Sequence, residues 1–131
     1  MVAIDVSVTT TGNGAEGAVV DNASRLTITG GSVTTSGTTA NGLRSTTGSL
    51  LTAIGVSIST TGSGTGATAQ FGGRLVLNGG SVTTAGPSSV GLFAVGLNGA
   101  TGASIAADGT VSPPRGRRLT ESRCAAAAAS R

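Results

Sequence analysis

Few side chains in this sequence could take part in catalysis. The 131 residues include no His, and all 8 basic residues are Arg. Without His or Lys there is no Ser-His-Asp or Cys-His nucleophile, no ordinary zinc site and no lysine for Schiff-base chemistry. The single cysteine, Cys124, lies among Ala residues close to the C-terminus, and we expect no catalytic role for it.

Carboxylates are the remaining candidates, and the body of the chain has Asp5, Glu16, Asp21 and Asp108. A glycosidase pair lies roughly 5–9.5 Å apart. In the repeat architecture argued below, Asp5 and Asp108 are about four repeats apart, which is roughly 19 Å at ~4.8 Å per repeat. Asp5 and Asp21 should lie on different faces of one turn. Glu16 and Asp21 could approach each other across a strand, but no other catalytic group accompanies them. We therefore predict solvated charges, no catalytic or metal-binding residue, and no cofactor.

Ser and Thr side chains recur two residues apart in four short runs. Alternate side chains of a strand point to opposite faces, so these hydroxyls should form two outward columns. The columns are Ser7, Ser32, Ser57 and Ser81, and Thr9, Thr34, Ser59 and Thr83. Flat Thr-rich faces occur in ice-binding β-helices, and such a face could also bind carbohydrate. Our main interpretation is that Ser and Thr simply suit exposed strand positions.

The composition excludes a conventional core of large side chains. Gly accounts for 23 residues, aromatic residues for 2% and charged residues for 10%, while hydrophobic content reaches 37%. Up to residue 110, three Arg stand against four acidic residues, a net charge of −1. The overall net charge of +3 therefore comes from the C-terminal segment. The body lacks the basic surface that nucleic-acid binding requires.

Two similar stretches, RLTITGGSVTTSG ending at Gly37 and RLVLNGGSVTTAG ending at Gly86, are 49 residues apart, and a related GVSIST begins between them at Gly55. The central apolar residues step by 25, 25, 24 and 23 positions through Val8, Val33, Ile58, Val82 and a weaker Ile105. Two other series keep the same step: Gly17, Gly42, Gly66, Gly91, and Leu26, Leu51, Leu75, Ala100. The 49-residue echo is thus two units of one shorter repeat.

Each unit contains three short runs with a period of two, separated by Gly, Asn, Ser or Pro, and no run in the body has helical spacing. This pattern predicts an all-β fold. Three strands per unit of about 24 residues favour a right-handed parallel β-helix of about 4–5 turns. A sandwich of hairpins is the alternative, because it also explains the Asn-Gly pairs, but it does not require one phase-locked unit.

We expect residues 1–110 to form the β-helix, with units starting near residues 6, 31, 56, 80 and 103. The repeat stops at about Val111, and residues 111–131 bring an Arg cluster and a run of Ala. We expect this basic segment to be a disordered tail, and we hypothesise that it is read out of frame after a truncation. No signal peptide is recognisable in MVAIDVSV, and no window approaches the ~18 apolar residues of a membrane span.

The stretches LTITGGSVTTSGTTANGL and LVLNGGSVTTAGPSSVGLFA resemble the passenger regions of bacterial autotransporter proteins of the pertactin-like type. The shared pattern is a strand, Gly-Gly, a Ser/Thr-rich strand and a small-residue turn into a Gly-aliphatic strand, over roughly residues 4–110. The resemblance implies a right-handed β-helix that is exported across two membranes and displayed for adhesion or virulence. It assigns no functional residue. We find no C-terminal translocator barrel and no Arg-Gly-Asp motif in the sequence.

We therefore expect a structural, surface-display β-helix fragment that is adhesin-like and has no catalysis of its own. The alternatives are a remnant of a polysaccharide-active β-helix enzyme and a binding module that uses the Thr-rich face. The parent protein is expected at the cell surface or secreted, associated with the outer membrane. Expected partners are a host-surface or carbohydrate ligand and, through the open ends of the β-helix, other copies of the chain.

Overall fold

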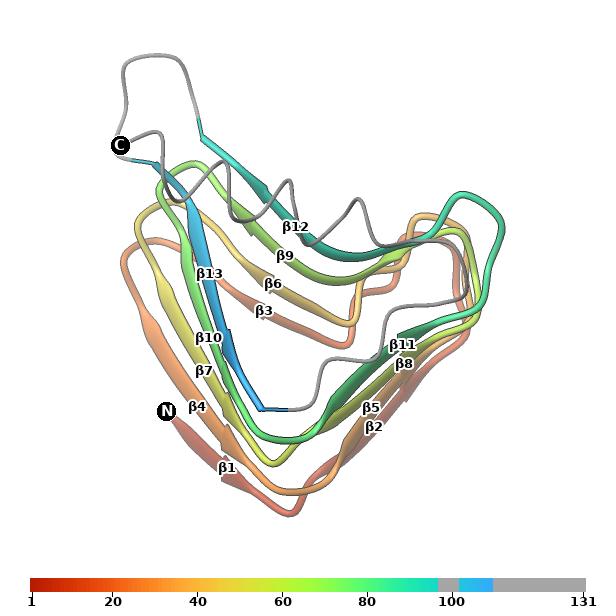
Figure 1. The fold of residues 1–131 in the computed structure, drawn as a ribbon, viewed down its shortest axis with the longest axis horizontal. Helices are drawn as coiled ribbons and strands as arrows, with labels where there is room; N and C mark the ends of the chain where they lie inside the picture. The colour runs from red at the N-terminus through yellow and green to blue at the C-terminus, as the bar shows by residue number, and fades with distance from the viewer. Residues whose placement is uncertain (97–101, 110–131) are drawn as a thin grey trace.

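The computed structural model describes residues 1–96 and 102–109, and within them the chain forms thirteen β-strands in three parallel sheets. Figure 1 shows the chain passing through the three sheets in turn and returning to the first, so that each circuit, here called a rung, stacks on the one before. The rungs wind in a right-handed sense. The predicted all-β parallel β-helix is confirmed, with about four rungs. Residues 111–131, with Cys124, lie outside the described residues.

The three sheets draw one strand from each rung. The first sheet contains β1 (Val2–Ile4), β4 (Arg25–Thr29), β7 (Leu50–Ile54), β10 (Arg74–Asn78) and β13 (Ser104–Asp108). The second sheet contains β2 (Ser7–Thr10), β5 (Ser32–Thr35), β8 (Ser57–Thr60) and β11 (Ser81–Thr84). The third sheet contains β3 (Ala18–Val20), β6 (Leu43–Ser45), β9 (Thr65–Gln70) and β12 (Val90–Val95).

The strand register follows the sequence repeat. In the second sheet the successive partners are the predicted core residues Val8, Val33, Ile58 and Val82. Leu26, Leu51 and Leu75 are successive partners in the first sheet. Side chains from all three sheets meet in one buried cluster, in which Leu43, Leu51 and Ala67 are fully buried. Period-two alternation therefore does place one face of each run in a shared core.

The phase predicted for Ile105 is wrong. Ile105 pairs with Leu75 in the first sheet and does not extend the Val82 series of the second sheet. The position predicted for Ala100 in the first-sheet series is therefore taken by Ile105, while Ala100 itself lies outside the described residues. Ile105 is 9% exposed, so the end strand still contributes to the core. The unit expected near residue 103 thus begins a new rung on the first sheet.

Core volume alternates from rung to rung at the corner between the first and second sheets. The second and fourth rungs pair a large residue with glycine three positions later, namely Ile28 with Gly31 and Leu77 with Gly80. The third rung reverses the sizes, because Ala53 is the partner of both large residues and buried Val56 stands at the glycine position. We infer that this exchange keeps the packed volume of the corner similar from rung to rung. This alternation explains why the two similar stretches that end at Gly37 and Gly86 lie two repeat units apart.

Ala53→Leu, Val56→Gly and the double variant test this exchange. Leu alone overfills the corner and is expected to cost about 1–3 kcal/mol, whereas Gly alone leaves a cavity. Together they reproduce the Leu77–Gly80 combination, so the double variant should lose at least about 1 kcal/mol less than the sum of the single losses. Urea unfolding of the four proteins measures this coupling. Strictly additive losses would contradict a volume exchange.

Candidate functional surface

The four carboxylates of the described residues do not converge. Asp5 follows β1, and Asp108 lies at the end of β13, four strands away in the same sheet. Asp21 follows β3 at a different corner, between the third and first sheets. Asp5 and Asp108 therefore lie at opposite ends of the solenoid, and Asp5 and Asp21 lie at different corners, as predicted. No two of these three acids lie at one place on the surface.

Glu16 is held by neighbours from the second rung. Its Oε1 atom accepts a hydrogen bond from Asn41 Nδ2 at 2.9 Å and forms an ion pair with Arg44 Nη1 at 3.0 Å. Asn41 Oδ1 in turn accepts a hydrogen bond of 3.0 Å from the backbone N–H of Thr65 in the third rung. The Glu16 and Arg44 side chains are 14% and 33% exposed. These bonds tie three rungs together, and we assign this cluster a structural role.

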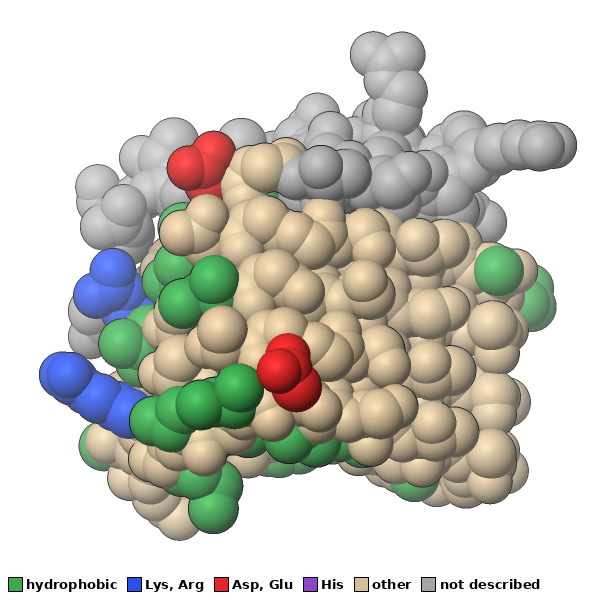
Figure 2. Space-filling view, turned by 90° about the horizontal axis from the view of Figure 1, so that it is seen from below, with side chains coloured by type: hydrophobic (Ala, Val, Ile, Leu, Met, Phe, Trp, Pro, Cys, Tyr) green, Lys and Arg blue, Asp and Glu red, His purple; other side chains and the backbone are tan. Residues whose placement is uncertain are grey.

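The predicted outward hydroxyl columns are present on the second sheet. Ser7, Ser32, Ser57 and Ser81 are successive partners, as are Thr9, Thr34, Ser59 and Thr83. Neighbouring hydroxyls are close enough to bond, because Ser7 Oγ lies 3.2 Å from Ser32 Oγ. Figure 2 shows a broad tan area of uncharged polar side chains and backbone on the right, with hydrophobic and basic side chains gathered on the left. The second sheet thus presents a flat, uncharged, hydroxyl-rich face.

A third hydroxyl column, which was not predicted from the sequence, points inward. It consists of Thr10, Thr35, Thr60 and Thr84, of which the last three are buried. Thr35 Oγ1 donates to the Ala40 carbonyl at 3.3 Å and lies 3.2 Å from Thr60 Oγ1. Thr84 Oγ1 has no hydrogen-bond partner among the residues that the structure describes. Val8 and Thr10 are two residues apart, so strand alternation places both on the inward face. Thr10 was not predicted to point inward, because a polar residue type favours an outward position.

Two arginines remain exposed on the first sheet. Arg25 begins β4 and Arg74 begins β10, with Leu50 between them as the partner of both. The two arginines therefore lie two rungs apart in one column of the sheet. In the parts of the chain that the structure describes, the one ion pair is Arg44–Glu16, so neither Arg25 nor Arg74 forms an ion pair there. Both side chains are exposed to solvent.

Residues 1–96 and 102–109 contain no group of three His, Cys, Asp or Glu side chains arranged to hold a metal ion. They also contain no helix of the length and hydrophobicity needed to cross a membrane. Comparisons with protein-family models, with curated proteins and with solved structures found no match to this chain.

Two threonines of the inward column test the value of its hydrogen bonds. Thr84→Val replaces an unpartnered buried hydroxyl by a methyl group of similar size, so it should stabilise the fold by about 1 kcal/mol. Thr35→Val removes the bonds to Ala40 and Thr60 and should cost about 1–2 kcal/mol. Equilibrium unfolding of both variants checks the opposite signs. Equal losses would mean that the Thr84 hydroxyl has a partner.

Proposed function

We propose that this chain is a structural, surface-display segment of an autotransporter passenger, adhesin-like and without catalysis of its own. The observation that carries the proposal is the in-register parallel solenoid, whose sheets continue across rungs at the same register. A solenoid of this kind extends by adding rungs, so it holds distant surfaces at fixed spacing. This is the mechanical property that a display stalk requires.

The outer surface supports the same proposal. The second-sheet face bears uncharged hydroxyl groups. The Arg44–Glu16 ion pair joins the first and second rungs at the third sheet. Side chains of this kind keep a rigid stalk hydrated while leaving particular positions free for contact with a host-surface or carbohydrate ligand. The location implied for the parent protein is the cell surface, associated with the outer membrane, or the secreted fraction.

The first rung supports end-to-end self-association as part of this proposal. The outer edges of β1, β2 and β3 pair with no other strand among the described residues. Met1, Val2 and Ile4 are 90%, 67% and 66% exposed at this end. Unpaired strand edges with apolar neighbours recruit further strands. Another copy of the chain supplies such strands.

Protease treatment of intact producing cells tests display. A surface-displayed chain should be cleaved in intact cells, while a cytoplasmic marker protein in the same cells remains whole. Detection uses an antibody raised against residues 1–96. A chain that resists protease until the cells are lysed would contradict the proposal.

A further inference from the structure

Three stacked β-turns form the corner between the third and first sheets. Their closing hydrogen bonds run from Ser24 N to Asp21 O at 3.2 Å, from Ser49 N to Thr46 O at 3.1 Å and from Gly73 N to Gln70 O at 2.8 Å. Both central residues of each turn have positive φ. This geometry is that of a type I′ turn, in which Asn followed by Gly is strongly preferred.

The first central position of these turns holds a different residue in each rung. It is Asn22 with φ 55°, Thr47 with φ 52° and Phe71 with φ 50°. A bulky side chain at positive φ is strained, and asparagine is among the residues that tolerate it best. Because Asn22 makes the same turn, the solenoid does not need an aromatic residue at this corner. The presence of Phe71 therefore calls for a reason other than folding.

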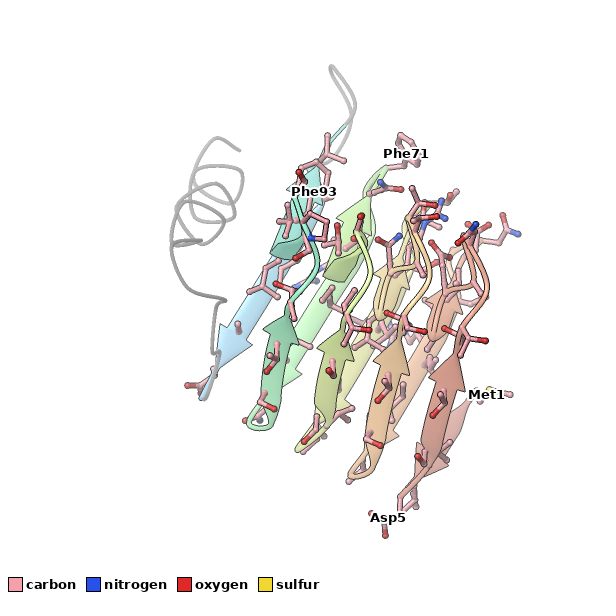
Figure 3. The ribbon with its side chains drawn as sticks, turned by 90° about the vertical axis from the view of Figure 1, so that its right-hand side faces the viewer. Met1, Asp5, Phe71 and Phe93 are labelled. Atoms are coloured by element: carbon pink, nitrogen blue, oxygen red, sulfur yellow. The ribbon has the colours of Figure 1, made fainter. Side chains whose placement is uncertain are left out.

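Phe71 is also only half-buried. The residue is 45% exposed, although the chain has only two aromatic residues, both Phe. Figure 3 shows Phe71 beyond the end of β9, at the outer limit of the solenoid. Its N–H donates to the Val95 carbonyl at 3.3 Å, and Val95 is itself 37% exposed. The corner thus presents an apolar residue on strained backbone, and strained backbone residues cluster at functional sites.

A charged residue follows this turn in the chain. Arg74 begins the strand that follows the turn and is exposed, and no acidic side chain in the described residues pairs with it. An aromatic face attracts partly positive C–H groups, and a guanidinium binds a carboxylate through two parallel hydrogen bonds. A sugar ring that carries a carboxylate matches both groups.

We propose that Phe71 and Arg74 form a binding site for an acidic saccharide, with the sugar ring on the Phe71 face and its carboxylate on Arg74. This inference names a ligand for the display function proposed above and rests on that proposal for its biological setting. Nucleic acid fits less well, because its binding relies on several phosphate contacts, whereas the site offers the single guanidinium of Arg74. A membrane surface fits less well, because a single ring offers little apolar area for insertion.

Calorimetric titration of the purified full chain with a tetramer of β-1,4-linked glucuronate tests the site. Phe71→Asn should weaken binding at least ~10-fold, because an aromatic anchor is lost. It should also raise the melting temperature by roughly 4 °C, because Asn relieves the strain at positive φ. Thr47→Asn is the matched control, and it should raise the melting temperature similarly with binding unchanged. Arg74→Gln should weaken binding and reduce its dependence on salt.

A tetramer of β-1,4-linked glucose supplies the same ring without the carboxylate, and it should bind at least ~10-fold more weakly than the glucuronate tetramer. The proposal is overturned by equal binding of the two sugars, by full binding in Phe71→Asn or by the absence of saturable binding in the parent chain. Preferential binding to anionic lipid vesicles or to single-stranded DNA would also overturn it. Because the protein is purified, these results are independent of the protease test, so failure of the site and failure of display are distinguishable.

Discussion

The second, third and fourth rungs of this solenoid each pack a core side chain against a glycine of the preceding rung. A Cβ atom on Gly17 would overlap Val33 Cγ1, one on Gly42 would overlap Ile58 Cγ2, and one on Gly66 would overlap Val82 Cγ1. The same added atoms would also collide with the carbonyl oxygen of the next glycine in the column. The close approach of third-sheet backbones and the burial of second-sheet aliphatic residues are therefore one constraint.

This constraint explains how a chain with so few large side chains forms a core. Because glycine leaves room, side chains of moderate size such as Val33 and Ile58 reach 1% and 2% exposure without aromatic neighbours. Repetition of the contact keeps successive rungs in phase, and residues on the outer faces are then free to vary. Outer positions in one column accordingly range from Asn22 to Phe71. Function in such a fold is expected at positions where a side chain departs from what the repeat requires.

Much of the architecture could be predicted from the sequence, because the period-two alternation of apolar side chains and the repeat length recur in every rung. The sequence series that begin at Val8 and at Gly17 are the two sides of one contact, so each supports the phase of the other. Ile105 is the exception. Its spacing of 23 residues from Val82 continues the second-sheet series, whereas the residues around it follow the first-sheet pattern. The run SIAADG lacks the Thr-Thr pair of the second-sheet runs and ends in Gly109, which has a φ of 97° and follows its strand as Gly30 follows β4. The corner site was not predictable, because its strain and exposure depend on a turn without the Asn-Gly signal.

The glycine contact can be tested by comparing two alanine substitutions. Gly42 does not have positive φ, so alanine is allowed by the backbone, and its cost measures the clash with Ile58 and Gly66. Gly12 is the matched control, because a Cβ there meets only Ala15 Cβ at an ordinary 3.5 Å. Urea unfolding should show a loss of at least about 2 kcal/mol for Gly42→Ala, as expected for an overpacked core, and little change for Gly12→Ala. Equal stability of the two variants would contradict the claim that this contact determines the fold.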